Sequence, residues 1–227
     1  MKLLSTCAAA AALALLASAG TASAQDVDIS ANVVVASDYV FRGFSQTAED
    51  PALQGAVDLT IGSFYAGVWA SNVDFGDNTD AEIDVYGGFR GEAAGFAYDV
   101  GVVTYLYAPG ANQDYDYVEL KAAASRAIGP VTAGAVVYFS PDFFGADDEA
   151  TYVEVNAAIT PVENLTLSAA VGEQFLNVTD DYVTWNIGGA YAFPGTPLVL
   201  DVRYHDTDVD NVAIADGRVV GSLKVVF

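Results

Sequence analysis

The clearest sign of the fold is in the last ten residues, Arg218-Val219-Val220-Gly221-Ser222-Leu223-Lys224-Val225-Val226-Phe227. Apolar residues or glycine occupy every second position from Val219 to Phe227, and most of the charged and polar residues lie on the other parity. A repeat of two residues places successive side chains on opposite faces of a β-strand. The stretch therefore predicts a strand with one apolar face and one mixed face.

The last residue, Phe227, adds a second signal to this strand. An aromatic residue at the end of an alternating strand resembles the C-terminal signal by which bacterial outer-membrane barrels are recognised for assembly. We therefore predict that Phe227 is an assembly signal and that the barrel-assembly machinery is a partner of the C-terminal strand. The localisation that this implies is the cell outer membrane, with lipid against the apolar faces.

The same alternation recurs along residues 27–227 and predicts an all-β chain. We expect a transmembrane antiparallel up-and-down β-barrel of about 12 strands, because single-chain bacterial barrels have an even number of strands. A barrel of ten strands and a soluble β-sandwich are the alternatives. The expected strands span 27–41, 53–61, 64–70, 82–90, 96–106, 118–125, 131–139, 152–159, 165–171, 182–191, 198–205 and 218–227.

The connections between these strands alternate in length, which is typical of the two ends of an outer-membrane barrel. Short turns are expected at 62–63, 91–95, 128–130, 160–164 and 193–197. Longer, acidic loops are expected at 43–52, 74–81, 109–114, 140–150, 173–181 and 206–217. Both chain ends then lie on the short-turn side, and aromatic residues of the outward parity, including Tyr39 and Phe41, lie near the rims facing lipid.

The N-terminal residues indicate secretion. A basic Lys2, an apolar run over Leu3–Ala17 and the small residues Ala22-Ser23-Ala24 predict a signal peptide over 1–24 that is cleaved to leave 25–227 as a single barrel domain. A retained membrane anchor is the alternative, disfavoured because the apolar run is short for a spanning helix. The one cysteine of the chain, Cys7, lies in this segment, so the mature chain forms no disulfide.

The charge of the chain limits its partners. The formal net charge is −22, with eight Lys and Arg residues against 30 Asp and Glu. Nucleic acid is excluded as a partner, because its phosphates require clustered cations. The acidic stretches 74–80 and 206–211 could hold calcium, but solvated surface charge is the better interpretation, since neither has the full EF-hand spacing. Divalent cations bridging these acids to lipopolysaccharide would give them a further use.

Charged residues of both signs on the inward parity predict a polar lumen. Acids outnumber bases, which favours cations over anions. Tyr86, Tyr105, Tyr138 and Tyr152 are expected to narrow the lumen of a barrel of this intermediate width. The candidate pore-lining residues are Asp38, Arg42, Asp58, Glu82, Asp84, Arg90, Asp99, Glu119, Lys121, Glu154, Asp201 and Arg203.

The block Ser37-Asp38-Tyr39-Val40-Phe41-Arg42-Gly43-Phe44-Ser45-Gln46-Thr47, with Pro51 after it, resembles the opening of the TorF-type porins of Gram-negative outer membranes. The resemblance implies a porin-like barrel. It supports an inference about the architecture of this chain better than one about its mechanism. From the residues themselves, the block is either a structural strand end or the source of a cation, Arg42, in the pore constriction. Asp38 and Arg42 are each expected to meet an opposite charge on a neighbouring strand.

Three functions fit these observations. The favoured one is a porin-like channel for passive diffusion of small solutes or ions, with a preference for cations. The second is a non-conducting structural or adhesion barrel with a plugged lumen. The third, a barrel hydrolase, would need a serine beside the one histidine, His205, which by parity points inward. We predict no catalytic residue, no metal site and no cofactor.

Overall fold

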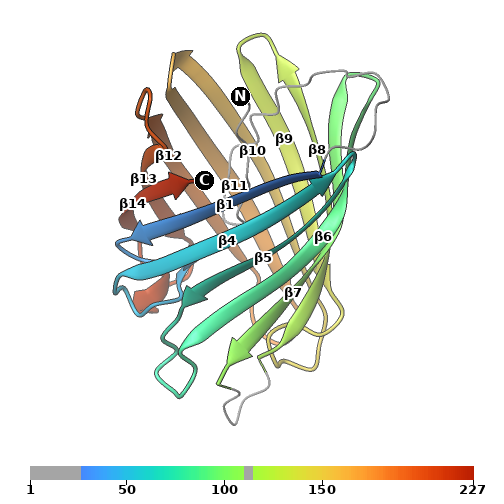
Figure 1. Cartoon of the computed structure of the whole chain (residues 1–227). Coiled ribbons are helices and arrows are strands. Elements are labelled where there is room, and N and C mark those ends of the chain that lie inside the picture. Colours follow the sequence, from blue (N-terminus) through green and yellow to red (C-terminus); the bar gives the residue numbers. More distant parts are fainter. Residues whose placement is uncertain (1–26, 110–114) are drawn as a thin grey trace.

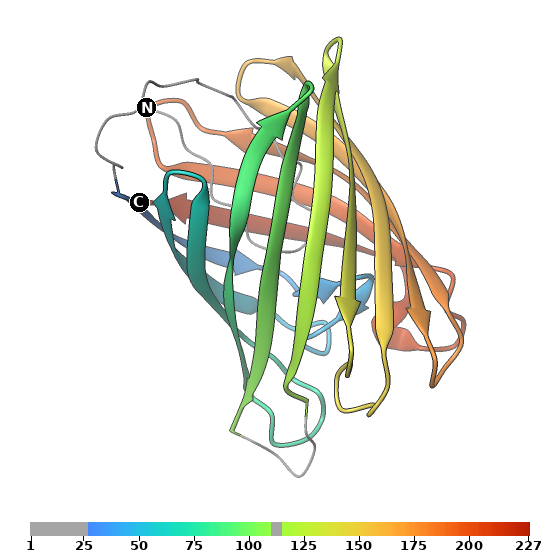
Figure 2. The same ribbon diagram turned by 90° about the vertical axis from the view of Figure 1, so that its right-hand side faces the viewer.

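The computed structural model describes residues 27–109 and 115–227. Twelve antiparallel strands form a closed barrel in which each strand pairs with its sequence neighbours and the first pairs with the last (Figures 1 and 2). This confirms the predicted fold class and strand number. The strands of the wall are β1 (Val27–Ala36), β4 (Ala52–Ile61), β5 (Phe64–Asn72), β6 (Ala81–Ala93), β7 (Phe96–Ala108), β8 (Tyr117–Ile128), β9 (Val131–Ser140), β10 (Ala150–Val162), β11 (Leu165–Leu176), β12 (Tyr182–Ala192), β13 (Leu198–Thr207) and β14 (Arg218–Val226).

Three shorter elements lie outside the wall. The strands β2 (Val40–Phe41) and β3 (Phe44–Ser45) form a separate two-stranded hairpin, and η1 (Ala213–Ala215) is one turn of 3-10 helix. Within the described ranges, no helix is long and apolar enough to cross a bilayer. The predicted signal peptide, residues 1–24, lies outside the described residues and stays a prediction.

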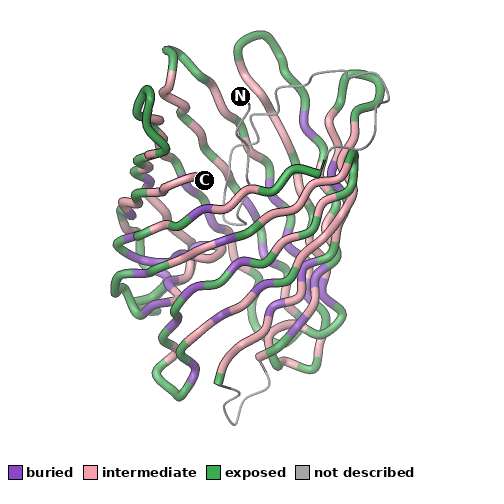
Figure 3. Tube along the Cα trace, in the orientation of Figure 1, coloured by how far each residue is buried: buried purple, intermediate pink, exposed green. Residues whose placement is uncertain are grey.

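The barrel is apolar outside and polar inside. On β10, Val155 is 53% exposed on the outer face, whereas the neighbouring Glu154 is 8% exposed and faces the lumen. Exposed and buried positions alternate in this way along the strands (Figure 3). The side chains that are less than 2% exposed include Glu82, Glu119 and Gln174. Such a distribution suits lipid on the outside and polar contacts within, as a membrane-spanning barrel requires.

The two ends of the barrel differ in the length of most of their connections. The turns that follow β4, β6, β8, β10 and β12 are short, whereas the connections after β1, β5, β9 and β13 are longer. The predicted longer loop at 173–181 is wrong, because β11 continues to Leu176 and leaves a connection, 177–181, that is no longer than the turn 193–197. The predicted loop at 109–114 lies outside the described residues except for its first position. The described chain begins in β1 and ends in β14 at the short-turn end. Aromatic pairs lie near the rims of the outer face, among them Phe64 with Phe89 at 5.1 Å between ring centroids. Trp185 and Tyr204 make a second pair, at 5.1 Å.

The expected first strand, 27–41, is too long. β1 ends at Ala36, and the chain then turns into the lumen, so the prediction that Tyr39 and Phe41 face lipid is wrong. Tyr39 is 4% exposed and its ring lies 5.2 Å from that of Trp69, on the inner face of β5. The continued alternation of apolar residues past Ala36 reflects contacts inside the barrel, not a longer wall strand.

A candidate pore constriction formed by an inward hairpin

The residues 37–47, here called the inward hairpin, fold into the lumen between β1 and β4. Phe41 pairs with Phe44 and Val40 with Ser45, so the turn consists of Arg42 and Gly43. Both turn residues have positive φ, +46° and +90°, which is typical of the tight two-residue turns of β-hairpins. Glycine suits this place for a second reason: a Cβ on Gly43 would lie 2.2 Å from Cγ2 of Thr207 on β13.

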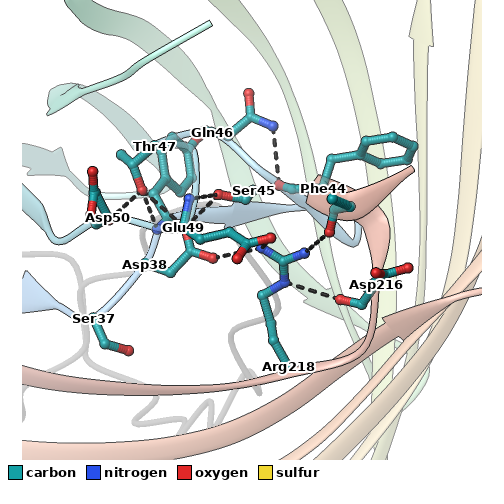
Figure 4. A network of polar contacts seen from close by, with 12 residues as sticks. Ser37, Asp38, Phe44, Ser45, Gln46, Thr47, Glu49, Asp50, Asp216 and Arg218 are labelled. Atoms are coloured by element: carbon teal, nitrogen blue, oxygen red, sulfur yellow. Dashed lines mark hydrogen bonds and ion pairs between the residues drawn. The ribbon is translucent and has the colours of Figure 1, made fainter. Parts of the chain in front are cut away.

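A polar network holds the base of the inward hairpin (Figure 4). The Asp38 carboxylate accepts a hydrogen bond of 2.7 Å from the Ser45 hydroxyl and lies 2.9 Å from the Thr47 hydroxyl. Arg218 at the start of β14 donates to the other oxygen of Asp38 at 3.1 Å. This pair confirms the expectation that Asp38 meets an opposite charge on a neighbouring strand. Because the two ends of the hairpin share one buried carboxylate, its base is fixed to the wall.

The tip of the inward hairpin crosses the lumen to the opposite wall. Both terminal nitrogens of Arg42 donate to Glu119 on β8, at 2.8 and 2.7 Å, and one also donates to Gln174 on β11 at 2.9 Å. A guanidinium that meets a carboxylate with two parallel hydrogen bonds forms the strongest common geometry of this pair. From the sequence, we expected the partner of Arg42 on a neighbouring strand. This prediction is wrong, because the partner lies across the lumen on β8.

Aromatic rings surround the Arg42 guanidinium. Its central carbon lies 4.7, 5.0 and 4.4 Å from the ring centroids of Phe41, Tyr138 and Tyr152. Burial alone would lower the pKa of Arg42, but the charge of Glu119 and the hydrogen bonds to it raise the pKa above its ordinary value. Arg42 therefore stays cationic, and the pair with Glu119 neutralises its charge locally.

The side of the inward hairpin that faces β5 and β6 packs against both polar and apolar side chains of the wall. The Tyr39 hydroxyl donates to Glu82 at 3.1 Å, and Val40 and Tyr39 pack with Trp69 and Ala56 of the wall. Phe41 lies 6.0 Å from Tyr105, which in turn stacks on Tyr117 at 4.2 Å. The hairpin thus occupies the lumen toward the long-loop end and leaves less space there than the wall alone would enclose.

A cavity of about 150 Å³ continues from the hairpin toward the short-turn end. Phe41 and Arg42 line its end at the hairpin, and Arg90, Asp99 and Lys121 line it farther down. Asp99 pairs with Lys121 at 2.8 Å and with Arg90 at 3.2 Å. Its lining is mostly apolar, but these charged side chains face into it, and it is larger than one water molecule needs, so it can hold water and small ions.

The structure gives each of the twelve candidate pore-lining residues a place on the inner side. Asp38 and Arg42 lie in the inward hairpin, and the other ten lie on wall strands. Those ten are Asp58 on β4; Glu82, Asp84 and Arg90 on β6; Asp99 on β7; Glu119 and Lys121 on β8; Glu154 on β10; Asp201 and Arg203 on β13. That they line a pore in use stays a prediction, and so does the assembly role of Phe227, whose side chain is 71% exposed.

Three residues of the constriction are missing from the predicted set. The alternating pattern places Tyr39 against lipid, Gln174 carries no charge to mark it, and Gly43 has no side chain to assign to either face. The Arg42-Gly43 pair was the available signal for a tight hairpin turn, since glycine at the second turn position is a strong preference of such turns. Arg-Gly is a weaker sequence signal for such a turn than Asn-Gly, because arginine seldom adopts positive φ.

The features that would support an enzyme or a metal site are sparse. His205 lies on the inner face of β13 and borders the cavity. Among the described residues, no hydrogen bond joins His205 to a serine, and no group of three or more His, Cys, Asp or Glu is arranged to hold a metal.

In the acidic 74–80 loop, the Asp77 carboxylate accepts a hydrogen bond of 2.7 Å from the backbone N–H of Thr79, and this bond lowers the pKa of Asp77.

Solved structures with the same fold are outer-membrane porins and channels. The KdgM porin gives a TM-score of 0.61 at 8% identity, covering 87% of this chain and 98% of that chain. The KdgM porin in complex with disordered oligogalacturonate gives 0.60 at 7% identity, with 88% and 97% covered. The COG4313 outer membrane channel from Pseudomonas putida F1 gives 0.51 at 13% identity, with 92% and 99% covered. At these identities the likeness shows the fold alone.

Sequence comparison gives the family. A search of the curated proteins finds no match. A family model matches residues 18–226, which include every strand of the barrel. The chain therefore belongs to the family described as "Bacterial protein of unknown function (Gcw_chp)".

Proposed function

We propose that this protein is a narrow outer-membrane channel for passive diffusion of small solutes or ions, with a preference for cations. The observation that carries the proposal is a polar lumen inside an apolar wall, narrowed at one level by the docked inward hairpin. A fixed constriction above a cavity lined in part by charged side chains is what a size-selective pore needs. The porin fold and the resemblance of residues 37–47 to TorF-type porins support the same proposal.

The distribution of charge in the lumen supports the preference for cations. The candidate pore-lining set holds eight carboxylates and four cations. The cations are occupied by acids: Arg42 with Glu119, Arg90 and Lys121 with Asp99, and Arg203 with Asp201. Other carboxylates accept hydrogen bonds from neutral groups, such as Asp58 from Tyr86 and Glu154 from Tyr152. The negative charge that remains would attract cations into the lumen and repel anions.

Ion selectivity in a planar bilayer tests this proposal. In a KCl gradient, we expect discrete conductance steps and a reversal potential on the side of the K⁺ equilibrium potential, with K⁺ severalfold more permeant than Cl⁻. A reversal potential on the Cl⁻ side would contradict the cation preference. It would point instead to acidic solutes, of the kind that the KdgM porin holds in its complex with oligogalacturonate.

A second function, a non-conducting barrel that presents its loops, has one observation in its favour. The inward hairpin is attached at its base through Asp38 and at its tip through Arg42, so it could close the lumen. The same bilayer experiment separates the two functions. Protein that is shown to be folded and inserted, yet gives no conductance steps, would support the closed barrel and contradict the channel.

A further inference from the structure

Two carboxylates beside the inward hairpin differ from the other lumen acids. Glu82 and Asp84 lie two residues apart on the inner face of β6, so their Cα atoms are about 7 Å apart. Glu82 is 1% exposed and Asp84 is 5% exposed. Asp84 borders the cavity below the hairpin, whereas Glu82 lies one level higher, against the Tyr39 hydroxyl. The pair is thus buried at the level of the constriction.

Each of these carboxylates carries an oxygen that accepts no hydrogen bond from residues 27–109 or 115–227. Oε2 of Glu82 and Oδ1 of Asp84 are buried without a hydrogen-bond partner. Burying an ionised carboxylate costs several kcal/mol unless a cation or hydrogen bonds compensate it. Two such oxygens on adjacent inward positions therefore mark a place that a bound positive charge would stabilise.

The cationic side chains that the structure describes do not supply this charge. Arg42, the cation at the hairpin tip, donates to Glu119 and Gln174. In the part of the chain that the structure describes, the ion pairs of the lumen include neither Glu82 nor Asp84. Two carboxylates at neighbouring inward positions of β6, with the Tyr39 hydroxyl beside Glu82, offer only hard oxygen donors, which suit alkali and alkaline-earth cations.

We propose that Glu82 and Asp84 form a binding site for a hard metal cation beside the constriction, entered from the cavity past Asp84. The proposal rests on the proposed channel function and gives it a mechanism: cations pause between these carboxylates as they pass the hairpin. Two carboxylates in place of a complete cage give binding strong enough to enrich cations and weak enough to release them, as conduction requires.

Terbium luminescence tests the site without requiring conductance. Tb³⁺ is a hard cation that prefers oxygen ligands, and a nearby tryptophan sensitises its emission. Trp69 pairs with Asp84 across β5 and β6, and its ring packs on that of Tyr39. The chain has two tryptophans, so Trp185→Phe on the outer face leaves Trp69 as the donor. In this background, we expect Tb³⁺ emission excited through tryptophan.

The test variant is Glu82→Gln/Asp84→Asn, which keeps side-chain shape and removes two charges. We expect a severalfold loss of Tb³⁺ emission. The matched control, Glu92→Gln/Glu163→Gln, removes two exposed acids at the short-turn end and should leave the emission unchanged. If Ca²⁺ displaces Tb³⁺ at a lower concentration than K⁺ does, the site is assigned to alkaline-earth cations. If K⁺ displaces Tb³⁺ at the lower concentration, the site is assigned to alkali cations. Equal emission from the test variant and its background would overturn the site.

Bilayer currents distinguish failure of the site from failure of the channel. With the site in place, Glu82→Gln/Asp84→Asn should lower the K⁺/Cl⁻ permeability ratio severalfold, while the single-channel steps persist. A conducting variant with an unchanged ratio contradicts the site and leaves the channel function standing. Tb³⁺ emission that depends on Glu82 and Asp84 in a protein without conductance contradicts the channel function and still supports the site.

Discussion

Replacing Arg42 by alanine is expected to enlarge the pore and destabilise the barrel at once. The substitution removes the two hydrogen bonds to Glu119 and the one to Gln174 that hold the hairpin tip across the lumen. It also leaves Glu119 buried without its cation, since both side chains of the pair are at most 6% exposed. Removing one partner of a buried ion pair costs about 3 kcal/mol or more. We expect severalfold higher single-channel conductance and a lower free energy of unfolding from lipid vesicles.

Two further variants separate the charge from the shape of Arg42. Arg42→Lys keeps the charge but not the planar fork, so we expect intermediate conductance and stability. Arg42→Ala/Glu119→Gln removes the unpaired carboxylate and should regain part of the lost stability while conductance stays high. Unchanged conductance in Arg42→Ala would show that the hairpin tip does not limit the current.

The second large effect is expected from Gly43→Ala at the hairpin turn. Gly43 has φ +90°, and an added Cβ would lie 2.2 Å from Thr207 and 2.7 Å from Thr184 on the wall. Left-handed backbone costs a residue other than glycine about 1–2 kcal/mol, and overpacking adds about 1–3 kcal/mol. We therefore expect the hairpin to move away from β12 and β13, with lower stability and larger, noisier single-channel currents.

Gly76→Ala is the matched control for this prediction. Gly76, in the loop between β5 and β6, has φ +74°, but a Cβ there would have no neighbour within 4 Å. It therefore tests the backbone cost without the steric conflict. If Gly43→Ala behaves like Gly76→Ala in both stability and conductance, the close packing of the hairpin turn against the wall contributes little.

The wall of the barrel was predictable because one physical rule determines it. A strand that separates lipid from a polar lumen needs apolar residues at every second position, and this period survives in a single sequence. Turn residues and the alternation of loop lengths added the strand number and the placement of the ends. The inward parity also identified the charged residues of the lumen, since parity alone decides which face a strand residue joins.

The inward hairpin was not predictable in the same way. Tyr39 and Phe41 continue the alternation of β1, so the sequence pattern does not show that the chain leaves the wall after Ala36. The contacts that hold it there are distant in sequence: Glu119 and Gln174 lie 77 and 132 residues from Arg42. Period and composition are local signals, whereas a partner across the lumen depends on how the barrel closes.

Thiol modification of two neighbouring residues on β8 tests most directly whether ions pass through the lumen beneath the hairpin. Ala123 borders the cavity, and Ala122 faces outward beside Val100 and Val137. The one natural cysteine, Cys7, lies in the predicted signal peptide, so each substitution supplies the only thiol of the mature chain. In a bilayer, a charged methanethiosulfonate reagent should remove most of the current through Ala123→Cys and leave Ala122→Cys unchanged. Equal responses of the two variants, or none in either, would contradict a conducting lumen.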